Sequence, residues 1–200
     1  MKRLLILATR NPDKLREIQA KLVSLDVEIL SLSEFSHVRE VEEDRPDLMG
    51  NAIKKACQVA EDVGEWVLAD DTGLEVDALD GAPGVLSARY SGLGATYDSN
   101  CSKLLRELET IPDGERQARF KTVICLRTPD SLHCVEGVLE GEIIRERRGA
   151  KGFGYDPVFG LPDGRTLAEL ELDEKNSISH RGLAIEKMRR VLEFLLRGEV

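Results

Sequence analysis

Apolar residues at the start of the chain form two strand-length runs with a helical pattern between them. The runs are Leu4–Ala8 and Val27–Leu32. Between them, apolar side chains recur at helical spacing, at Leu15, Ile18, Leu22 and Leu25. Pro12 suits the first turn of that helix, because its missing N–H would have no partner there. This order predicts a β-α-β unit with parallel strands and the helix packed across them.

The rest of the chain predicts three more helices and several strands. Helices are expected over Asp47–Val63, over Asp98–Leu108 and from Ser179 onward. The expected strands are Trp66–Ala69, Leu74–Leu79, Arg119–Arg127, Leu132–Leu139 and Glu142–Glu146, with a hairpin at Thr128-Pro129-Asp130-Ser131. An α-β opening followed by a strand-rich second half indicates an α/β fold with a mixed sheet.

The length, composition and net charge of the chain limit its domain organisation and its binding partners. The 200 residues suit one domain, and 42% hydrophobic residues supply a real core. A net charge of -9 disfavours binding to a nucleic acid polymer, although a small nucleotide can still be held in a locally basic pocket. The apolar run at the N-terminus is too short for a signal peptide or a membrane span, so we expect a cytoplasmic protein without membrane contacts.

The four cysteines form no C-x-x-C pair, which argues against a zinc or redox motif. They are Cys57, Cys101, Cys125 and Cys134, and each falls in an apolar or helical pattern. We therefore expect four buried free thiols in a reducing cytosol.

The first candidate site is Thr9–Lys14, where a strand feeds a helix. Free backbone N–H groups and the positive end of the helix dipole favour an anion at such a junction. Thr9 and Asn11 offer hydrogen bonds, and Lys14 offers charge to phosphate oxygens. A capped helix with a solvated lysine is the alternative that these residues leave open.

The second candidate site consists of carboxylates, which are the ligands that magnesium prefers. Glu42, Glu43 and Asp44 form an acidic run, and Asp70 and Asp71 end an apolar strand. Strand alternation points Asp70 and Asp71 to opposite faces, so we expect only one of them to enter a given site. A solvated acidic loop and ordinary turn chemistry are the respective alternatives.

Two further segments carry groups suited to a nucleotide. Glycines in the loop 151–157 allow close approach of a flat ligand, and an exposed ring there can stack on a base. The polar segment 175–182 offers His180 and Arg181 as donors, with Ser177 or Ser179 as a helix N-cap. An aromatic plug in the core and a simple helix cap are the alternatives. With no convincing Ser-His-Asp or Cys-His arrangement, the segments together favour a metal-nucleotide pocket over a covalent hydrolase.

Taken in order along nearly the whole chain, these segments resemble the inosine/xanthosine triphosphate pyrophosphatase family. The matching motifs are Thr9–Lys14, Asn51–Ala56, Ala69–Leu74 with Gly81–Tyr90, Phe153–Pro157 and Ser179–Arg181. Each motif is weak alone, and five in sequence are highly specific. Arg10 stands where the family commonly has Gly, and Thr72 where it commonly has Ser.

The resemblance implies a single domain over residues 1–200, with an elongated mixed β-sheet flanked by helices and two lobes around a nucleotide-binding cleft. It also implies a homodimer, Mg2+ as cofactor, Asp71 as the catalytic residue, and Glu42 with Asp71 as metal ligands, although Glu43 or Asp44 could replace Glu42. By motif, the substrate-binding residues are Thr9, Arg10, Asn11, Pro12, Asp13, Lys14, Lys55, Thr72, Phe153, Gly154, Tyr155, Asp156, Lys175, His180 and Arg181.

The activity that the resemblance implies is hydrolysis of non-canonical purine nucleoside triphosphates, ITP, dITP and XTP, to the monophosphate and pyrophosphate. Water would attack the α-phosphorus while magnesium offsets the triphosphate charge. Two alternatives stay open: a pyrophosphatase for other altered nucleotides, including pyrimidines, and a non-catalytic nucleotide-binding module.

Overall fold

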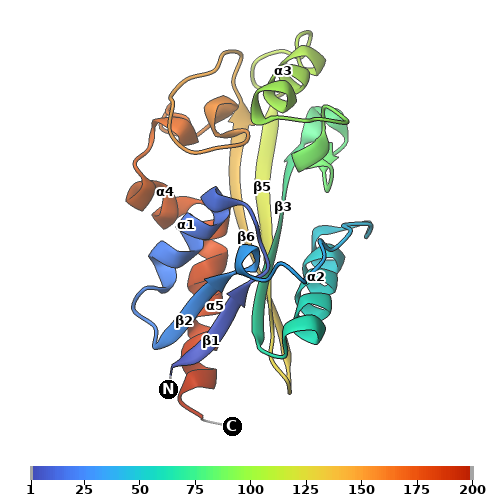
Figure 1. Cartoon of the computed structure of the whole chain (residues 1–200). Coiled ribbons are helices and arrows are strands. Elements are labelled where there is room, and N and C mark those ends of the chain that lie inside the picture. The colour runs from blue at the N-terminus through green and yellow to red at the C-terminus, as the bar shows by residue number, and fades with distance from the viewer. Residues whose placement is uncertain (1, 199–200) are drawn as a thin grey trace. The chain divides into compact units, whose positions relative to one another are not determined.

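The computed structural model describes residues 2–198 and contains a mixed sheet with strand order β2-β1-β3-β5-β6-β7, to which β4 adds by pairing with β3 (Figure 1). The strands are β1 (Arg3–Leu7), β2 (Val27–Ser31), β3 (Trp66–Val76), β4 (Pro83–Gly84), β5 (Gln117–Arg127), β6 (Leu132–Ile143) and β7 (Phe159–Gly160). The α-helices are α1 (Pro12–Leu22), α2 (Leu48–Val63), α3 (Tyr97–Glu107), α4 (Leu172–Ile178) and α5 (His180–Leu196). The predicted mixed α/β class is confirmed.

Two compact units divide the chain. Unit 1 contains the residues up to Asp71, Thr122–Gly137 and the residues from His180 on. Unit 2 contains Thr72–Lys121 and Val138–Ser179. The long strands β3, β5 and β6 therefore contribute residues to both units.

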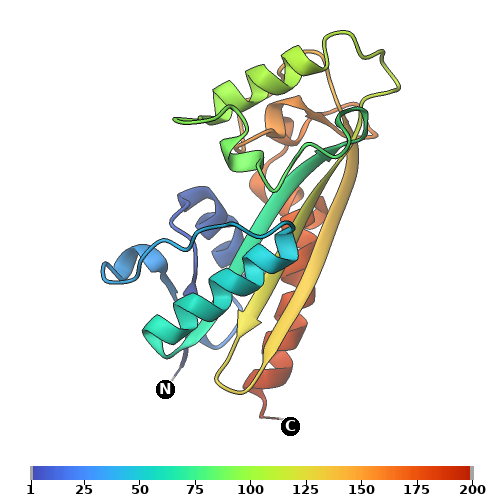
Figure 2. The same cartoon turned by 90° about the vertical axis from the view of Figure 1, so that its right-hand side faces the viewer.

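Unit 1 is built on the β-α-β opening, and the prediction for this segment is confirmed. Strand β1 pairs in parallel with both β2 and β3. Helices α1 and α5 cover one face of these strands and α2 covers the other (Figures 1 and 2). The core between the strands, α1 and α5 is apolar, and its fully buried members include Leu5, Leu7, Ile18, Leu22, Leu68, Ile124, Ala184 and Leu192.

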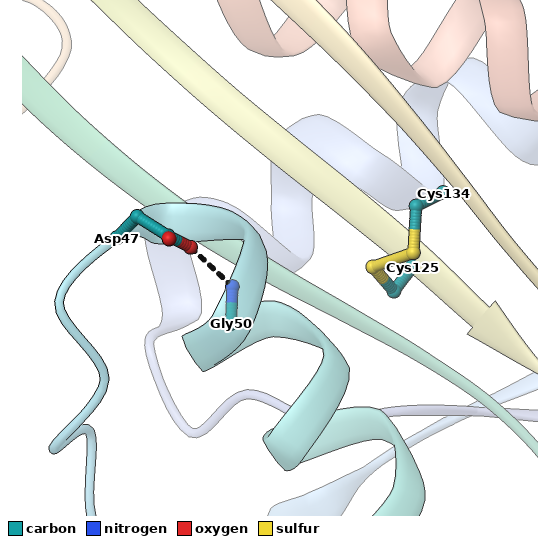
Figure 3. The surroundings of a disulfide bond; sticks show 4 residues. All are labelled: Asp47, Gly50, Cys125 and Cys134. Carbon is teal, nitrogen blue, oxygen red and sulfur yellow. Dashed lines mark hydrogen bonds between the residues drawn. A yellow bond between two sulfur atoms is a disulfide. The ribbon is translucent and has the colours of Figure 1, made fainter.

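Helix α2 has clear signals at both ends. The side chain of Asp47 caps its start by accepting a hydrogen bond from Gly50 N at 2.7 Å (Figure 3). Gly64 ends the helix with φ 71°, a left-handed conformation that favours glycine. Small residues on one face, Ala52 and Ala56, are fully buried. Their small side chains allow close packing on this face of the helix.

Unit 2 has its own core, in which α3 packs with apolar residues of the strands and loops. Buried members of this core include Leu74, Val76, Leu104, Leu108, Phe120, Phe159 and Leu167. The rings of Phe120 and Phe159 lie 4.7 Å apart between centroids. Arg116 is also buried and donates to the backbone carbonyls of Leu108 and Ile143, so it fastens the end of α3 to β6.

Three predictions of element boundaries are wrong. Trp66–Ala69 and Leu74–Leu79 belong largely to one continuous strand, β3, because Asp70–Gly73 stays extended. A separate strand at Glu142–Glu146 does not form, since β6 runs unbroken to Ile143. Ser177 cannot cap the last helix, because it lies inside α4. In the first two cases the polar residues stay extended within one strand, so polarity alone does not mark a break in the backbone pattern.

The predicted hairpin between β5 and β6 is confirmed, and it brings two cysteines opposite each other. Thr128 N donates to the carbonyl of Ser131 at 2.9 Å, a register that pairs Cys125 with Cys134. These two cysteines form a disulfide, with Cα atoms 4.2 Å apart (Figure 3). The expectation of four free thiols is therefore wrong for this pair, because a linear scan for C-x-x-C does not detect cysteines on facing strands.

Cys134→Ser is expected to lower the free energy of unfolding by about 2–3 kcal/mol without reductant, because the disulfide closes a short loop in the unfolded chain. Urea unfolding with and without dithiothreitol measures this effect. Cys57, like Cys101, is a free thiol, so Cys57→Ser should keep the wild-type response to reductant. A wild-type midpoint that does not change on reduction would contradict the prediction.

Candidate functional site

The Thr9–Lys14 segment forms the predicted strand-to-helix junction. Asn11 caps α1, since its Oδ1 accepts from Asp13 N at 2.9 Å and from Lys14 N at 3.3 Å. Thr9 Oγ1 accepts from Asn11 N at 3.1 Å. Pro12 opens the helix, and Arg10 donates to the carbonyl of Val38 at 2.7 Å, a sequence-distant loop contact. The junction is thus pre-formed, with a helix N-terminus suited to an anion.

Lys14 belongs to a buried cluster of charges on the α1 and α5 side of β3. Its Nζ lies 2.9 Å from Asp70 Oδ2, and Arg181 Nε lies 3.5 Å from the same oxygen. Burial alone would raise the pKa of Asp70, but the charges of Lys14 and Arg181 outweigh it and hold that pKa well below its usual range. Burial lowers the pKa of Lys14, with Lys55 and Arg181 adding repulsion. Asp70 is therefore the carboxylate that keeps two cations together.

Glu17 completes this cluster, and the sequence analysis missed it. Its carboxylate is buried and forms an ion pair with Arg181 of α5. A faint signal was available, because Glu17 lies one helical turn after Lys14 and next to the buried Ile18. Arg181, predicted to contact the substrate, has its guanidinium committed to the carboxylates of Glu17 and Asp70.

Asp71 faces the opposite side of β3, toward α2, which confirms the predicted divergence of the two aspartates. Burial raises the pKa of Asp71 to about 6; Lys55 opposes this shift, and Glu43 adds to it. The charge of Lys14 and the nearby Asn51 side chain also act to lower this pKa. Lys55 Nζ donates to the backbone carbonyl of Asp70 at 2.8 Å and forms an ion pair with Glu43.

The acidic loop presents its three carboxylates in different directions. Glu42 is exposed, and its backbone carbonyl accepts from Lys54 Nζ at 2.8 Å. Asp44 is also exposed and pairs with Lys54 at 2.8 Å. Glu43 is half-buried and raises the pKa of Asp71 through its charge, so it is close enough to act on that carboxyl. Of the three carboxylates, Glu43 is the one that is half-buried and whose charge acts on Asp71.

The glycine-rich loop of unit 2 is braced by a buried ion pair. Asp156 Oδ2 accepts from Lys175 Nζ at 2.6 Å and from Phe153 N at 2.8 Å. A Cβ at Gly152, where φ is +71°, would lie 2.1 Å from that same oxygen, so only glycine fits there. Phe153 packs against Lys175 Nζ, 4.7 Å from the ring centroid, and against the Tyr97 ring at 5.8 Å. The structure thus brings Phe153, Asp156 and Lys175 together.

Three other residues predicted to contact the substrate differ in their burial and in their neighbours. Tyr155 lies in the core of unit 2 and donates to the Ser87 carbonyl at 2.9 Å, in agreement with the aromatic-plug alternative for this ring. His180 is buried at the start of α5, where a Cβ at Gly137 would lie 2.0 Å from its carbonyl oxygen. Thr72, half-buried, continues β3 directly after Asp71.

The side chains of the described residues include few groups that could coordinate a metal ion together. Within residues 2–198, no group of three or more His, Cys, Asp or Glu side chains is arranged to hold a metal ion. Magnesium, however, often uses only one or two carboxylates, with phosphate oxygens and water completing its shell. Asp71 and Glu43 fit that requirement.

The helices within the described residues are all too short or too polar to cross a membrane.

These features define an α/β protein with a preorganised anion site, two half-buried lysines and an acidic pair suited to a divalent cation. The Ham1 family matches residues 5–191. Together with the relatives below, this match shows that the chain belongs to the Ham1 family. The resemblance inferred from the five motifs is confirmed.

Relatives and solved structures cover almost all of the chain. It is 48% identical over 193 residues to the dITP/XTP pyrophosphatase of Desulforamulus reducens, covering 96% of each chain. It is 49% identical over 187 residues to the dITP/XTP pyrophosphatase of Geobacter sulfurreducens, covering 92% of this chain and 94% of that protein. The solved structure of a HAM1 protein from Coxiella burnetii has a TM-score of 0.87 and 44% identity, covering 96% of this chain and 98% of that one.

Proposed function

We propose that this protein hydrolyses the triphosphates of non-canonical purines, dITP, XTP and ITP, to the nucleoside monophosphate and pyrophosphate. Near-full-length relatives with the name dITP/XTP pyrophosphatase support this activity. The observation that carries the proposal is the contrast between the neighbouring aspartates. Asp70 is neutralised by Lys14 and Arg181, whereas Asp71 is a buried carboxylate with a raised pKa beside Lys55.

Asp71 suits the role of the base that accepts a proton from the attacking water. Its pKa of about 6 leaves it ionised at pH 7 yet more basic than an exposed aspartate. Water then attacks the α-phosphorus, the bond from that phosphorus to the bridging oxygen breaks, and pyrophosphate leaves. The buried setting of Asp71 serves this step because it keeps bulk water from stabilising the carboxylate.

Lys14, Lys55 and the N-terminus of α1 are the groups proposed to bind the triphosphate. Each ammonium group has three N–H donors, and the ion pair of Lys14 with Asp70 uses one of them. Phosphate oxygens are strong acceptors for the remaining donors, and the positive end of the α1 dipole favours their charge. Arg181 then serves the site indirectly, because it fixes Asp70, which in turn orients Lys14.

We assign magnesium binding to Asp71 and Glu43, in place of the Glu42 favoured by the family motif. Glu43 is half-buried and its charge raises the pKa of Asp71, whereas Glu42 is exposed. When bound, the cation would neutralise charge on the triphosphate. Glu43 and Asp71 each carry a hard oxygen donor of the kind that magnesium requires.

The proposed base contacts come from the glycine-rich loop. Lys175 and Asp156 brace this loop, and the partly exposed Phe153 ring offers a stacking surface for a purine. A 6-oxo group accepts hydrogen bonds from backbone N–H groups, whereas the 6-amino group of adenine would leave such a donor unpaired at a cost of about 1–3 kcal/mol. Discrimination against ATP follows from that cost.

Incubating the protein with ITP and Mg2+ is expected to release IMP and pyrophosphate in equal amounts, at least about tenfold faster than with ATP. Chromatography of the nucleotides together with an enzymatic pyrophosphate assay measures both products. Addition of EDTA should abolish the reaction, and excess Mg2+ should restore it.

Other outcomes of this assay identify the competing functions. Release of orthophosphate would contradict the proposed bond cleavage, and equal rates on ITP and ATP would contradict the base preference. Tight binding of ITP without turnover would instead indicate a nucleotide-binding module. Faster cleavage of modified pyrimidine triphosphates would shift the substrate class.

A further inference from the structure

Gly137 of β6 lies against the first turn of α5. A Cβ at this position would lie 2.0 Å from the carbonyl oxygen of His180 and 2.7 Å from Ala184 N. These two backbone atoms are the acceptor and the donor that an α-helix pairs across one turn. Glycine weakens the interior of a strand, and it is typical of places where another backbone approaches closely. Gly137 therefore allows α5 to begin directly against β6.

The same turn of α5 carries Arg181, whose guanidinium contacts two carboxylates of unit 1. It forms a buried ion pair with Glu17 of α1, and its Nε lies 3.5 Å from Asp70 Oδ2. Lys14 Nζ lies 2.9 Å from that same oxygen of Asp70. Arg181 and Asp70 are both buried, so the packing around them leaves little room for rearrangement. The place where α5 begins therefore affects Lys14 through Arg181 and Asp70.

An added Cβ at Gly137 would move backbone, because no flexible side chain stands in its way to yield. Nonbonded heavy atoms rest about 3.5 Å apart, so β6 and the first turn of α5 would have to separate by about 1.5 Å. Arg181 Nε is already farther from Asp70 than the roughly 2.7–2.9 Å of a charge-assisted hydrogen bond, so this shift would separate them. Asp70 would then pair more closely with Lys14 and compete with phosphate oxygens for its N–H donors.

We propose that Gly137 is a positioning residue for triphosphate binding, because its missing side chain sets where α5 begins and thereby how Arg181 and Asp70 hold Lys14. This role rests on the proposed function of Lys14 as a ligand of the triphosphate. The effect is on substrate affinity and not on the chemical step, since Asp71 follows Asp70 along β3 and faces the other side of the sheet.

Gly137→Ala is expected to raise KM for ITP about tenfold and to leave kcat within about threefold, measured well below the thermal midpoint. Isothermal titration calorimetry with inorganic triphosphate, which has no base or sugar, should show a dissociation constant raised by the same factor. This second measurement separates the triphosphate contacts from the base contacts of unit 2.

Ala184→Val tests the same contact from the side of the helix. The position of a Cβ at Gly137 lies 3.1 Å from the Ala184 Cβ, so a larger side chain at 184 presses on the same part of β6. We expect KM for ITP and the dissociation constant for inorganic triphosphate each to rise about threefold. This variant decides the question if Gly137→Ala does not fold.

Leu192→Ala is the matched control, since it disturbs the packing of α5 about three turns after His180. Leu192 is fully buried in the core of unit 1, so its truncation should lower the thermal midpoint at least as much as Gly137→Ala. KM for ITP and the dissociation constant for inorganic triphosphate should stay within about twofold of wild type, because the first turn of α5 keeps its place.

Wild-type affinity for inorganic triphosphate in a folded Gly137→Ala variant would overturn the positioning role, as would an equal loss of affinity in Leu192→Ala. If only Ala184→Val folds, wild-type affinity in that variant overturns it. A wild-type protein that binds inorganic triphosphate but does not cleave ITP would instead refute the proposed function, so the two failures are distinguishable.

Discussion

Asp71→Asn is expected to lower kcat for ITP hydrolysis by about 10²–10⁴-fold while the protein stays folded. The amide has the same shape as the carboxylate but cannot accept a proton from water or carry the charge that a cation requires. Steady-state kinetics with ITP and Mg2+, together with a thermal unfolding curve, measure activity and fold separately.

Asp77→Asn is a suitable control for Asp71→Asn, because it also removes one carboxylate charge. Asp77 is exposed and pairs with Arg119 at 3.0 Å in unit 2. Its loss should leave kcat within about twofold, since exposed ion pairs contribute little. Near-normal activity of Asp71→Asn would remove Asp71 from the mechanism, whatever the control shows.

Asp70→Asn should act on stability, with a fall of about 3–5 kcal/mol in the free energy of unfolding at pH 7. The substitution leaves the half-buried Lys14 and the buried Arg181 beside a neutral amide, while Glu17 still offsets the charge of Arg181. Urea unfolding followed by circular dichroism measures the change. Two adjacent aspartates of one strand would thus differ in their main effect, with the larger loss of stability at Asp70 and the larger loss of turnover at Asp71.

Asp44→Asn provides the comparison for Asp70→Asn. Asp44 also forms a close ion pair, with Lys54 at 2.8 Å, but its side chain is exposed. The unfolding midpoint should stay almost unchanged, because solvent already stabilises both charges of an exposed pair. If Asp70→Asn unfolds at the wild-type urea concentration, the buried cluster does not support the fold.

Local signals predicted the parts of the site that depend on neighbouring residues. The strand-to-helix junction at Thr9–Lys14 follows from an apolar run, a cap residue and Pro12. The divergence of Asp70 and Asp71 follows from strand alternation, and the structure places them against different helices. Both inferences succeeded because each depends on backbone geometry over only a few residues.

Contacts between distant segments could not be derived from local patterns. Glu17 and Arg181 are 164 positions apart, and only the packing of α1 against α5 brings them together. The direction of Glu43 depends on the path of an irregular loop, which has no periodicity to interpret. The pairing of Cys125 with Cys134 depends on the register of the hairpin, which the spacing of cysteines along the chain does not reveal.

The disulfide across the hairpin also determines what a break in the backbone would do. Pro129 and Asp130, at the exposed turn, lie between Cys125 and Cys134, so a nick there would leave both fragments covalently linked through sulfur. Unit 1 takes residues from both sides of that position, including the whole of α5 from the second fragment. Cleavage at this turn would therefore leave the two fragments of the oxidised chain covalently linked. In the reduced chain, only noncovalent packing would hold the fragments together.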